Sequence, residues 1–445
     1  MKFRKFGKAL LMSALSAGAL LSVTSCVQSY SVGFLYVIGT QTSSSAGQGI
    51  ISGFKIDHNT GRLVSIAGLP MGTGGSYPER AVLISGSRFL YVLNKGTDAC
   101  VTDQPCTPTA NITEFAVGGN GVLAQQGPAY YTQGFNPFRM FVDSLGSHLF
   151  VLDHDAPTSA SCSLALGSGV SACGDITAFN IDTTTGRLSL IQNAQVSSAS
   201  GAPLPFFPVP AEPIDFLLNG GYVLTLSGTT ATGDSVFPYS YSQANGQLSV
   251  GQNTSQPLNI HNGTALQSGS TTVYVLDDEP LTIPSGSSSL FPAGTYPSQI
   301  LPFSVGTGGS LQAQTGGAVP TDATQSDPLF LLVENKSKWA YVANYGNNSN
   351  PNSAQSGITG YDINTQTNQL IPMPGSPFGT GAGPRCLIED PSNQFIYTAN
   401  FNSSTVTGLT LDQNQGVLKP LPGTANKAYA LPGPATYCLV DGRTS

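Results

Sequence analysis

The residues best suited to bind a charged ligand are three arginines that share one position. Each stands at the entrance to a short apolar run that we expect to be a strand: Arg80, Arg139 and Arg385. A guanidinium binds a carboxylate or phosphate through paired hydrogen bonds, so three of them at one mouth predict an anion-binding site. The alternative is that each arginine pairs with a neighbouring acid and only fixes packing, the acids being Glu79, Glu212 and Asp215.

Two of the four histidines fall in loops that we expect on the same side as the arginines, namely His154 and His261. Imidazole is suited to proton transfer near neutral pH, and with Glu212 as a partner either histidine could form an acid–base pair. These three residues are therefore the candidate catalytic groups. The alternative is that each histidine is only solvated. We interpret His58, beside an edge turn, and His148, at the start of a strand, as structural.

Two acidic turns could in principle hold Ca²⁺ through carboxylates and backbone carbonyls. They are Asp153-His154-Asp155 and Asp277-Asp278-Glu279. Neither follows the Asp-x-Asp-x-Asp-Gly spacing of calcium loops, so we interpret both as solvated turns. Zinc signatures, phosphate-binding glycine loops and nucleophilic serine elbows do not occur in the sequence. We expect no metal and no cofactor.

The elements that position these residues repeat along the chain. The cleanest copy has four short runs that we predict to be strands: Cys386–Glu389, Phe395–Asn400, Thr405–Asp412 and Gly416–Leu421. Four antiparallel strands make a small sheet that cannot bury both faces alone, and seven copies recur at a spacing of roughly 40 to 60 residues. The sequence therefore predicts an all-β fold, a seven-bladed β-propeller.

The end of the chain predicts how this ring closes. Pro434–Val440 reads like one more opening strand, aligned with Pro384–Asp390, and the first copy lacks its own opening strand. We therefore expect the C-terminal strand to join the first blade, which would remove exposed sheet edges. The propeller is expected to be a single domain over residues 34–442.

The N-terminus has the pattern of an export signal. A basic segment, Met1–Lys8, precedes an apolar run too short for a comfortable membrane span, and Val23-Thr24-Ser25 leads to Cys26. We interpret residues 1–25 as a lipoprotein signal peptide, Cys26 as the lipidation site and residues 26–33 as a linker. This predicts attachment to a membrane by a lipid anchor in the cell envelope, at the outer membrane or the periplasmic or extracellular face. An ordinary signal peptide is the alternative.

Charge and cysteine content agree with export. Charged residues make up only 9% of the chain, and loss of residues 1–25 would leave 13 basic against 24 acidic residues, a net charge of −11. An acidic surface argues against nucleic acid as a partner, and we expect a monomer. Six cysteines remain, which we pair as three disulfides: Cys100–Cys106, Cys162–Cys173 and Cys386–Cys438. Reduced, buried thiols are the alternative.

The repeats, of the form P…F-x-Y-V-x-N…G-[YF]-x-[IV]-D…G-x-L, resemble the lactonase family of seven-bladed propellers, which includes 6-phosphogluconolactonase, and the wider YVTN-type surface propellers. The resemblance covers residues 30–442. It implies an active site of His, Arg and Glu on the loop-bearing face. Gly383-Pro384-Arg385 matches the family's G-P-R-H entry, but Cys386 replaces the His. The family's Glu after a second strand is also replaced, by Lys95, Tyr345 and Phe401, so only Arg385 matches.

Two functions follow from these observations. The preferred hypothesis is a lipid-anchored binding or interaction scaffold whose loop-rich face binds an anionic small molecule or a protein partner at the cell surface. The alternative is an enzyme, a divergent lactonase that hydrolyses a sugar-derived lactone. In that case Arg80, Arg139 and Arg385 would hold the carboxylate or phosphate of the substrate.

Overall fold

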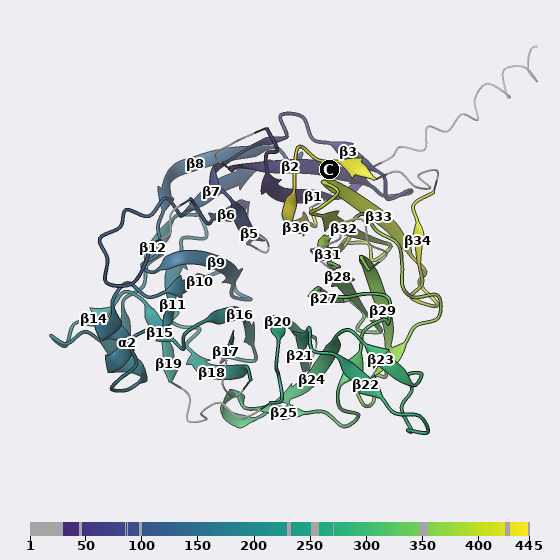
Figure 1. The fold of residues 1–445 in the computed structure, drawn as a ribbon. Helices are drawn as coiled ribbons and strands as arrows, with labels where there is room; N and C mark the ends of the chain where they lie inside the picture. Colours follow the sequence, from purple (N-terminus) through teal and green to yellow (C-terminus); the bar gives the residue numbers. More distant parts are fainter. Residues whose placement is uncertain are drawn as a thin grey trace, which may run out of the picture.

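The chain folds as a ring of seven antiparallel sheets around a central axis (Figure 1); each has four consecutive strands, and four of the sheets have a fifth strand. This computed structural model describes residues 30–43, 47–84, 86, 88–97, 100–228, 233–250, 258–269, 271–346, 355–422 and 428–443. The predicted all-β, seven-bladed propeller is confirmed. The signal peptide, Cys26 and its lipid anchor lie outside the described residues and stay predictions.

Each blade runs from an outer strand at the rim of the ring to an inner strand near the axis. Blade 1 contains, in that order, β3 (Leu63–Ser65), β2 (Gln48–Asp57), β1 (Ser31–Thr40) and β36 (Ala435–Asp441), with β4 (Met71–Ser76) beside β2. Blade 2 contains β8 (Leu123–Tyr130), β7 (Asn111–Val117), β6 (Phe89–Asn94) and β5 (Pro78–Leu83). Blade 3 contains β12 (Leu188–Leu190), β11 (Gly174–Ile181), β10 (His148–Asp155) and β9 (Phe135–Val142), with β15 (Phe207–Val209) beside β11. Blade 4 contains β19 (Leu248–Val250), β18 (Ser235–Tyr241), β17 (Tyr222–Ser227) and β16 (Pro213–Asn219).

The other three blades follow the same order. Blade 5 contains β25 (Leu311–Ala313), β24 (Gln299–Val305), β21 (Thr272–Asp277) and β20 (Gly263–Ser268), with β26 (Val319–Pro320) beside β24. Blade 6 contains β30 (Leu370–Pro372), β29 (Gly357–Ile363), β28 (Trp339–Asn344) and β27 (Pro328–Val333). Blade 7 contains β34 (Leu418–Pro420), β33 (Thr405–Leu411), β32 (Phe395–Asn400) and β31 (Pro384–Glu389), with β35 (Tyr429–Ala430) beside β33.

The C-terminal strand closes the ring as predicted. Strand β36 pairs antiparallel with β1, from Phe34 opposite Asp441 to Gly39 opposite Ala435. Blade 1 is thus built from both ends of the described chain (Figure 1). The Cys386–Cys438 disulfide joins this blade to the inner strand of blade 7, and the other two predicted disulfides, Cys100–Cys106 and Cys162–Cys173, are also present.

The core lies between blades because each blade covers the face of the next. All six residues of β28 and all six of β32 are buried, as expected for strands covered on both sides. At the closing seam, Leu35 and Val37 of blade 1 pack in one cluster with Tyr397 and Ala399 of blade 7. Burial of apolar surface at seven such seams holds the ring together.

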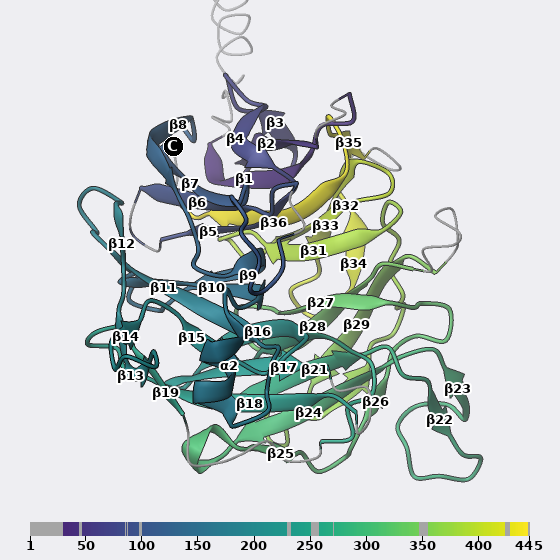
Figure 2. The same ribbon diagram turned by 60° about the vertical axis from the view of Figure 1, so that its left-hand side comes forward.

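Several elements outside the blades were not expected from the sequence. They are helix α2 (Ser159–Leu166), the hairpins β13 (Asn193–Ser197)–β14 (Pro203–Leu204) and β22 (Leu281–Ile283)–β23 (Gly294–Tyr296), and the 3-10 turn Thr307–Gly309. Helix α2 and the two hairpins lie at the outer edge of the ring (Figures 1 and 2). Over the described residues, no helix is both long enough and apolar enough to cross a bilayer.

Candidate active site

All seven inner strands carry a bulge at the same place, near their first residue. The residues left unpaired between the two flanking register pairs are Glu79, Phe138, Ile214, Thr264, Leu329, Arg385 and Thr436. A bulge adds one residue and changes which way the following side chains are directed. Arg80 and Arg139 come directly after the bulge, whereas Arg385 is itself the bulged residue. The three predicted arginines are therefore not equivalent: Arg80 and Arg139 share one position relative to the bulge, and Arg385 has another.

Arg80 and Arg139 are neighbours on adjacent blades. The Arg139 Nε donates to Asp215 Oδ1 at 3.0 Å, and its Nη1 donates to the Phe138 carbonyl at 3.2 Å. Arg80 lies over the Tyr437 ring, 4.8 Å from its centre. Burial and the like charge of Arg139 lower the pKa of Arg80 to about 10, so it remains a cation at neutral pH.

Asp215 gives Arg139 a structural partner. The Asp215 Oδ1 also accepts from the Phe216 N–H, and the Oδ2 accepts from the Leu266 N–H in blade 5 at 2.9 Å. The acid therefore ties the inner strands of blades 3, 4 and 5 together. For Arg139 the structure shows the ion pair of the packing interpretation, although Nη2 has no hydrogen-bond partner among the described residues.

Arg385 is held by aromatic rings instead of by an acid. Its guanidinium lies 4.5 Å from the centre of the Phe401 ring and 5.4 Å from that of Tyr345. Both rings follow second strands, at the positions where the sequence departs from the family pattern. Within the described part of the chain, the buried Arg385 Nε has no hydrogen-bond partner. Cation–π contacts of this kind fix the side chain without neutralising its charge.

A pocket of about 530 Å³ opens between blades 2 and 3, beside Arg139, and we call it the blade 2–3 pocket. It is lined by Glu79, Lys95, Asn136, Phe138, Arg139, His154 and Asp155. The His154 Nδ1 is 3.2 Å from Asp155 Oδ2, and the Asn136 Nδ2 donates to the same oxygen at 2.7 Å. The site thus combines an imidazole held by a carboxylate with two cationic side chains, which is suited to acid–base chemistry on a polar substrate.

The other histidines and Glu212 do not join this site. His148 is buried and contacts Asp143 Oδ2 at 2.8 Å and the Tyr241 hydroxyl at 3.0 Å, and His58 stacks on Tyr30. Both therefore have the structural roles predicted for them. His261 donates its backbone N–H to the carboxylate of Asp277. The described contacts do not bring Glu212 together with either His154 or His261.

The acidic turns have different surroundings. Asp277 accepts backbone N–H groups from Asn262 at 2.9 Å and Glu279 at 3.1 Å. Asp153 lies opposite Asp175 in the sheet, and burial raises the pKa of Asp153 to about 7. Across the described residues, no group of three or more His, Cys, Asp or Glu side chains is arranged to hold a metal ion.

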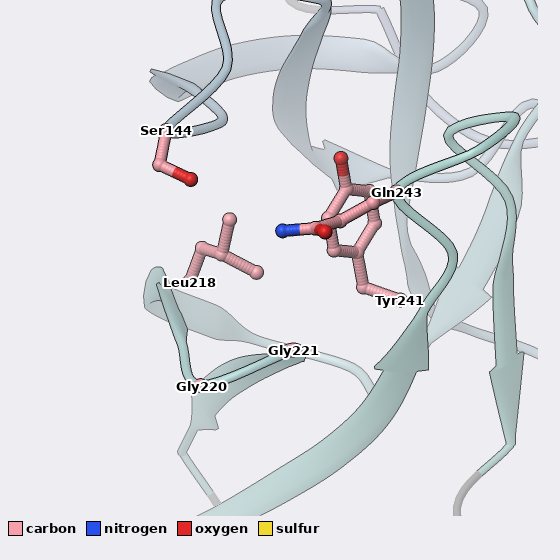
Figure 3. Close-up of a pocket in the computed structure, with 6 residues that line it drawn as sticks. All are labelled: Ser144, Leu218, Gly220, Gly221, Tyr241 and Gln243. Carbon is pink, nitrogen blue, oxygen red and sulfur yellow. The ribbon is translucent and has the colours of Figure 1, made fainter.

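A second pocket of about 500 Å³, shown in Figure 3, lies between blades 3 and 4. Ser144 and Gly220 follow the first strands of these blades, so this pocket is at the opposite end of the strands from the blade 2–3 pocket. Ser144, Leu218 and Gln243 surround the second pocket together with Tyr241. Its only titratable group, the Tyr241 hydroxyl, donates to Asp143 Oδ2 at 2.5 Å. Burial and this carboxylate raise the pKa of Tyr241, so the hydroxyl stays protonated and the pocket lacks an acid–base pair.

Comparison with known proteins agrees with this architecture. Residues 298–431 match the family model described as "Lactonase, 7-bladed beta-propeller". The match covers less than half of the chain and agrees with the seven-bladed ring. The matched segment covers the outer strands of blade 5 and all the strands of blades 6 and 7, including Arg385. The blade 2–3 pocket lies outside the matched residues. No curated protein matches the chain at the sequence level.

Solved structures share the fold of this seven-bladed propeller. A putative 6-phosphogluconolactonase from Bacteroides uniformis has 14% identity, a TM-score of 0.64 and coverage of 92% of this chain and 100% of its own. The periplasmic gluconolactonase of Pseudomonas aeruginosa has 16% identity, a TM-score of 0.59 and coverage of 92% and 99%. At such identities the likeness establishes the fold alone.

The sequence-based reasoning missed two pocket residues, Phe138 and Asn136. For Asn136, the sequence signal is its place directly before Pro137 at a blade entrance. In the structure it has a left-handed backbone (φ 58°), which Asn adopts more readily than most residues. The repeat pattern places Lys95, Glu79 and Asp155 on the correct face, but it does not group them as one pocket.

Proposed function

We propose that this propeller hydrolyses a lactone in the blade 2–3 pocket. The observation that carries the proposal is the His154–Asp155 pair in a pocket that Arg139 and Lys95 also line. The family supplies the reaction class, and the pocket supplies groups that fit it. The binding-scaffold hypothesis preferred from the sequence finds no support in the comparisons.

The pair provides a base in a defined tautomer. An ionised carboxylate only accepts hydrogen bonds, so Asp155 Oδ2 holds the proton of His154 on Nδ1 and leaves a lone pair on Nε2. Nε2 then takes a proton from water as the water oxygen bonds to the lactone carbonyl carbon. The negative charge that develops on the carbonyl oxygen is stabilised by the cationic Arg139 and Lys95.

Ring opening completes the reaction. The bond between the acyl carbon and the ring oxygen breaks, and the imidazolium of His154 returns its proton to that oxygen. The product is a hydroxy acid, and His154 is again neutral. Water is the only co-reactant, so the proposal requires no cofactor.

The charges of the pocket favour an uncharged lactone over a phosphorylated one. The cations Lys95, Arg139 and the adjacent Arg80 are matched in number by three carboxylates. These are Glu79 and Asp155, which line the pocket, and Asp215, which pairs with Arg139. A phosphate monoester carries about two negative charges at neutral pH and would leave this balanced site with an uncompensated charge. We therefore propose an aldonolactone such as δ-gluconolactone as the substrate type.

Three disulfides support an oxidising compartment, since such bonds rarely persist in the cytosol. Export with a lipid anchor on Cys26 remains our proposal for its location. The partners follow from the substrate: a small molecule at the pocket and the membrane through the anchor, with the propeller acting as a monomer.

The test is turnover of δ-gluconolactone above its spontaneous rate, measured beside the 6-phosphate. We expect the wild type to prefer the unphosphorylated lactone and His154→Gln to lose about 10²-fold or more in kcat. His261→Gln is the matched control, because His261 lies outside the pocket, and it should keep wild-type turnover. Absence of turnover in the wild type, or full turnover in His154→Gln, would refute the proposal.

A further inference from the structure

One amide group in the blade 2–3 pocket joins two segments that are far apart in the sequence. The Asn136 Nδ2 donates to the Cys100 carbonyl at 3.0 Å and to Asp155 Oδ2 at 2.7 Å. Both partners are pure acceptors, so only the NH₂ side of the amide can face them and its orientation is fixed. The same Asp155 oxygen contacts His154 Nδ1, which makes a continuous chain from the Cys100 carbonyl to the imidazole.

We infer that Asn136 is the positioning residue of this pocket: its amide holds the Asp155 carboxylate in the place from which it orients His154. The catalytic meaning of this inference rests on the proposed lactone hydrolysis, but the orientation of the imidazole does not. Asp155 is partly exposed, with 32% of its side-chain surface accessible, so without the amide it could turn towards solvent. The imidazole, 48% exposed, would then lose its only described hydrogen-bond partner.

The backbone role of this position can be separated from its side-chain role. The residue after each of several second strands donates its N–H to a left-handed residue: Lys95 to Tyr77, Gly228 to Glu212, Tyr345 to Asp327 and Phe401 to Gly383. The left-handed turn is thus a general feature of the blades and tolerates different side chains. What is particular to Asn136 is the amide between Cys100 and Asp155.

The acceptor at Cys100 is itself fixed by two disulfide-bonded loops that pack together. The Thr102 Oγ1 donates to the Ala156 carbonyl at 2.8 Å, and the Asp103 N–H donates to the Pro157 carbonyl at 3.1 Å. The Cys100–Cys106 bond closes the first loop, and Cys162–Cys173 closes the second. Asn136 therefore connects the candidate base to a covalently restrained surface, as outer hydrogen bonds commonly do for reactive imidazoles.

Two substitutions isolate the amide. Asn136→Gly keeps the left-handed backbone and removes the side chain, whereas Asn136→Asp keeps the shape and puts a carboxylate against two acceptors. Asn368→Gly is the matched control, since Asn368 has a similar φ of 56° in an edge turn of blade 6. Melting temperatures show that each variant folds.

The decisive readout is the ring tautomer of His154, from nitrogen-15 NMR of histidine-labelled protein at a pH where the ring is neutral. His154→Gln identifies its signal among the four histidines. We expect the Nδ1–H tautomer in the wild type and in Asn368→Gly, and a loss of that preference in both Asn136 variants. On δ-gluconolactone, both Asn136 variants should lose about 10- to 100-fold in kcat with KM little changed.

The tautomer measurement and the activity measurement test different proposals, namely the positioning role of Asn136 and the proposed lactone hydrolysis. If the wild type does not hydrolyse lactones, the proposed function fails, and the tautomer still decides whether Asn136 positions the ring. An unchanged tautomer in folded Asn136→Gly overturns the inference, whatever the activity. Wild-type kcat in that variant overturns it as well.

Discussion

The Tyr397 hydroxyl in blade 7 donates a hydrogen bond of 2.6 Å to the carbonyl of Gly61 in blade 1, across the seam where the ring closes. The same contact links a second-strand tyrosine to a turn glycine of the next blade at three other seams: Tyr36 to Gly121, Tyr91 to Gly186 and Tyr341 to Gly416. The closing seam therefore uses the same polar link as seams formed by consecutive blades. These tyrosines are fully buried, so each hydroxyl needs a partner.

Removing this link should weaken closure without changing the shape of the core. We expect Tyr397→Phe to lower the free energy of unfolding by about 1–3 kcal/mol, because the Gly61 carbonyl loses its buried donor. Urea denaturation measures this change in the free energy of unfolding. Tyr36→Phe, at a seam between consecutive blades, is the comparison and should cost a similar amount. A stability equal to the wild type in Tyr397→Phe would show that the hydrogen bond does not contribute to closure.

The Cys386–Cys438 bond should stabilise the protein more than the bond in the first loop. It spans 52 residues, against 6 for Cys100–Cys106. Loop-closure entropy then predicts a loss of about 4 kcal/mol when both Cys386 and Cys438 become Ala, and about 2 kcal/mol for the short loop. Chemical denaturation of the two double variants tests the order. The prediction fails if the short-loop variant is the less stable one.

The Asp153–Asp175 pair should make stability fall as pH rises. Burial raises the pKa of both carboxyls, that of Asp153 to about 7, with Asp153 adding to the shift of Asp175. The folded state therefore holds protons that the unfolded chain releases above about pH 4, and stability is lost between about pH 4 and 7. The expected loss is on the order of a few kcal/mol.

Blade 2 provides the matched control for this pair. There the equivalent residues are Asn94 and Asn111, and the Asn94 Nδ2 donates to Asn111 Oδ1 at 2.9 Å. Asp175→Asn should give the Asp153 carboxylate an amide donor, with the direction of donation reversed from blade 2, and flatten the decline of melting temperature with pH. Asn111→Asp should not create such a decline, since Asn94 can donate to the new carboxylate. A wild type whose stability is flat from about pH 4 to 7 would contradict the account.

Arg139 and Arg80 should differ in their effect on stability. Arg139→Ala leaves the buried Asp215 without its cation, and we expect a cost of about 1–3 kcal/mol, reduced from that of a fully buried pair because Arg139 is 21% exposed. Arg80→Ala removes a cation whose charge is already disfavoured by burial and by Arg139, so its cost should be smaller. Thermal unfolding of both variants checks the order. A larger loss for Arg80→Ala would contradict it.

The ring could be predicted from the sequence because its determinants are local and repeated. The apolar second strands, such as Phe395–Asn400, recur seven times. The extra run Pro434–Val440 could be assigned to blade 1 because only that repeat lacks an opening strand. The Cys386–Cys438 pair followed from the same alignment, and the other two pairs from the position of both cysteines within one connection. Helix α2 was missed because its eight residues carry no amphipathic pattern, and its position depends on the Cys162–Cys173 loop.

The site was less predictable because it depends on offsets of a single residue. Arg80, Arg139 and Arg385 stand at similar places in the sequence, but the bulge separates Arg385 from the other two. Contacts between loops, such as Asn136 with Cys100, join segments with no shared pattern. Composition and periodicity carry no information about such contacts.

The central claim, that the blade 2–3 pocket and not the matched Arg385 performs the reaction, is tested most directly by comparing kcat/KM on δ-gluconolactone for His154→Gln and Arg385→Gln. Arg385 packs on Tyr345 and Phe401 and does not line the pocket. We predict a loss of about 10²-fold or more for His154→Gln and a value within a few-fold of the wild type for Arg385→Gln. The reverse result, with activity lost in folded Arg385→Gln and retained in His154→Gln, would contradict the account.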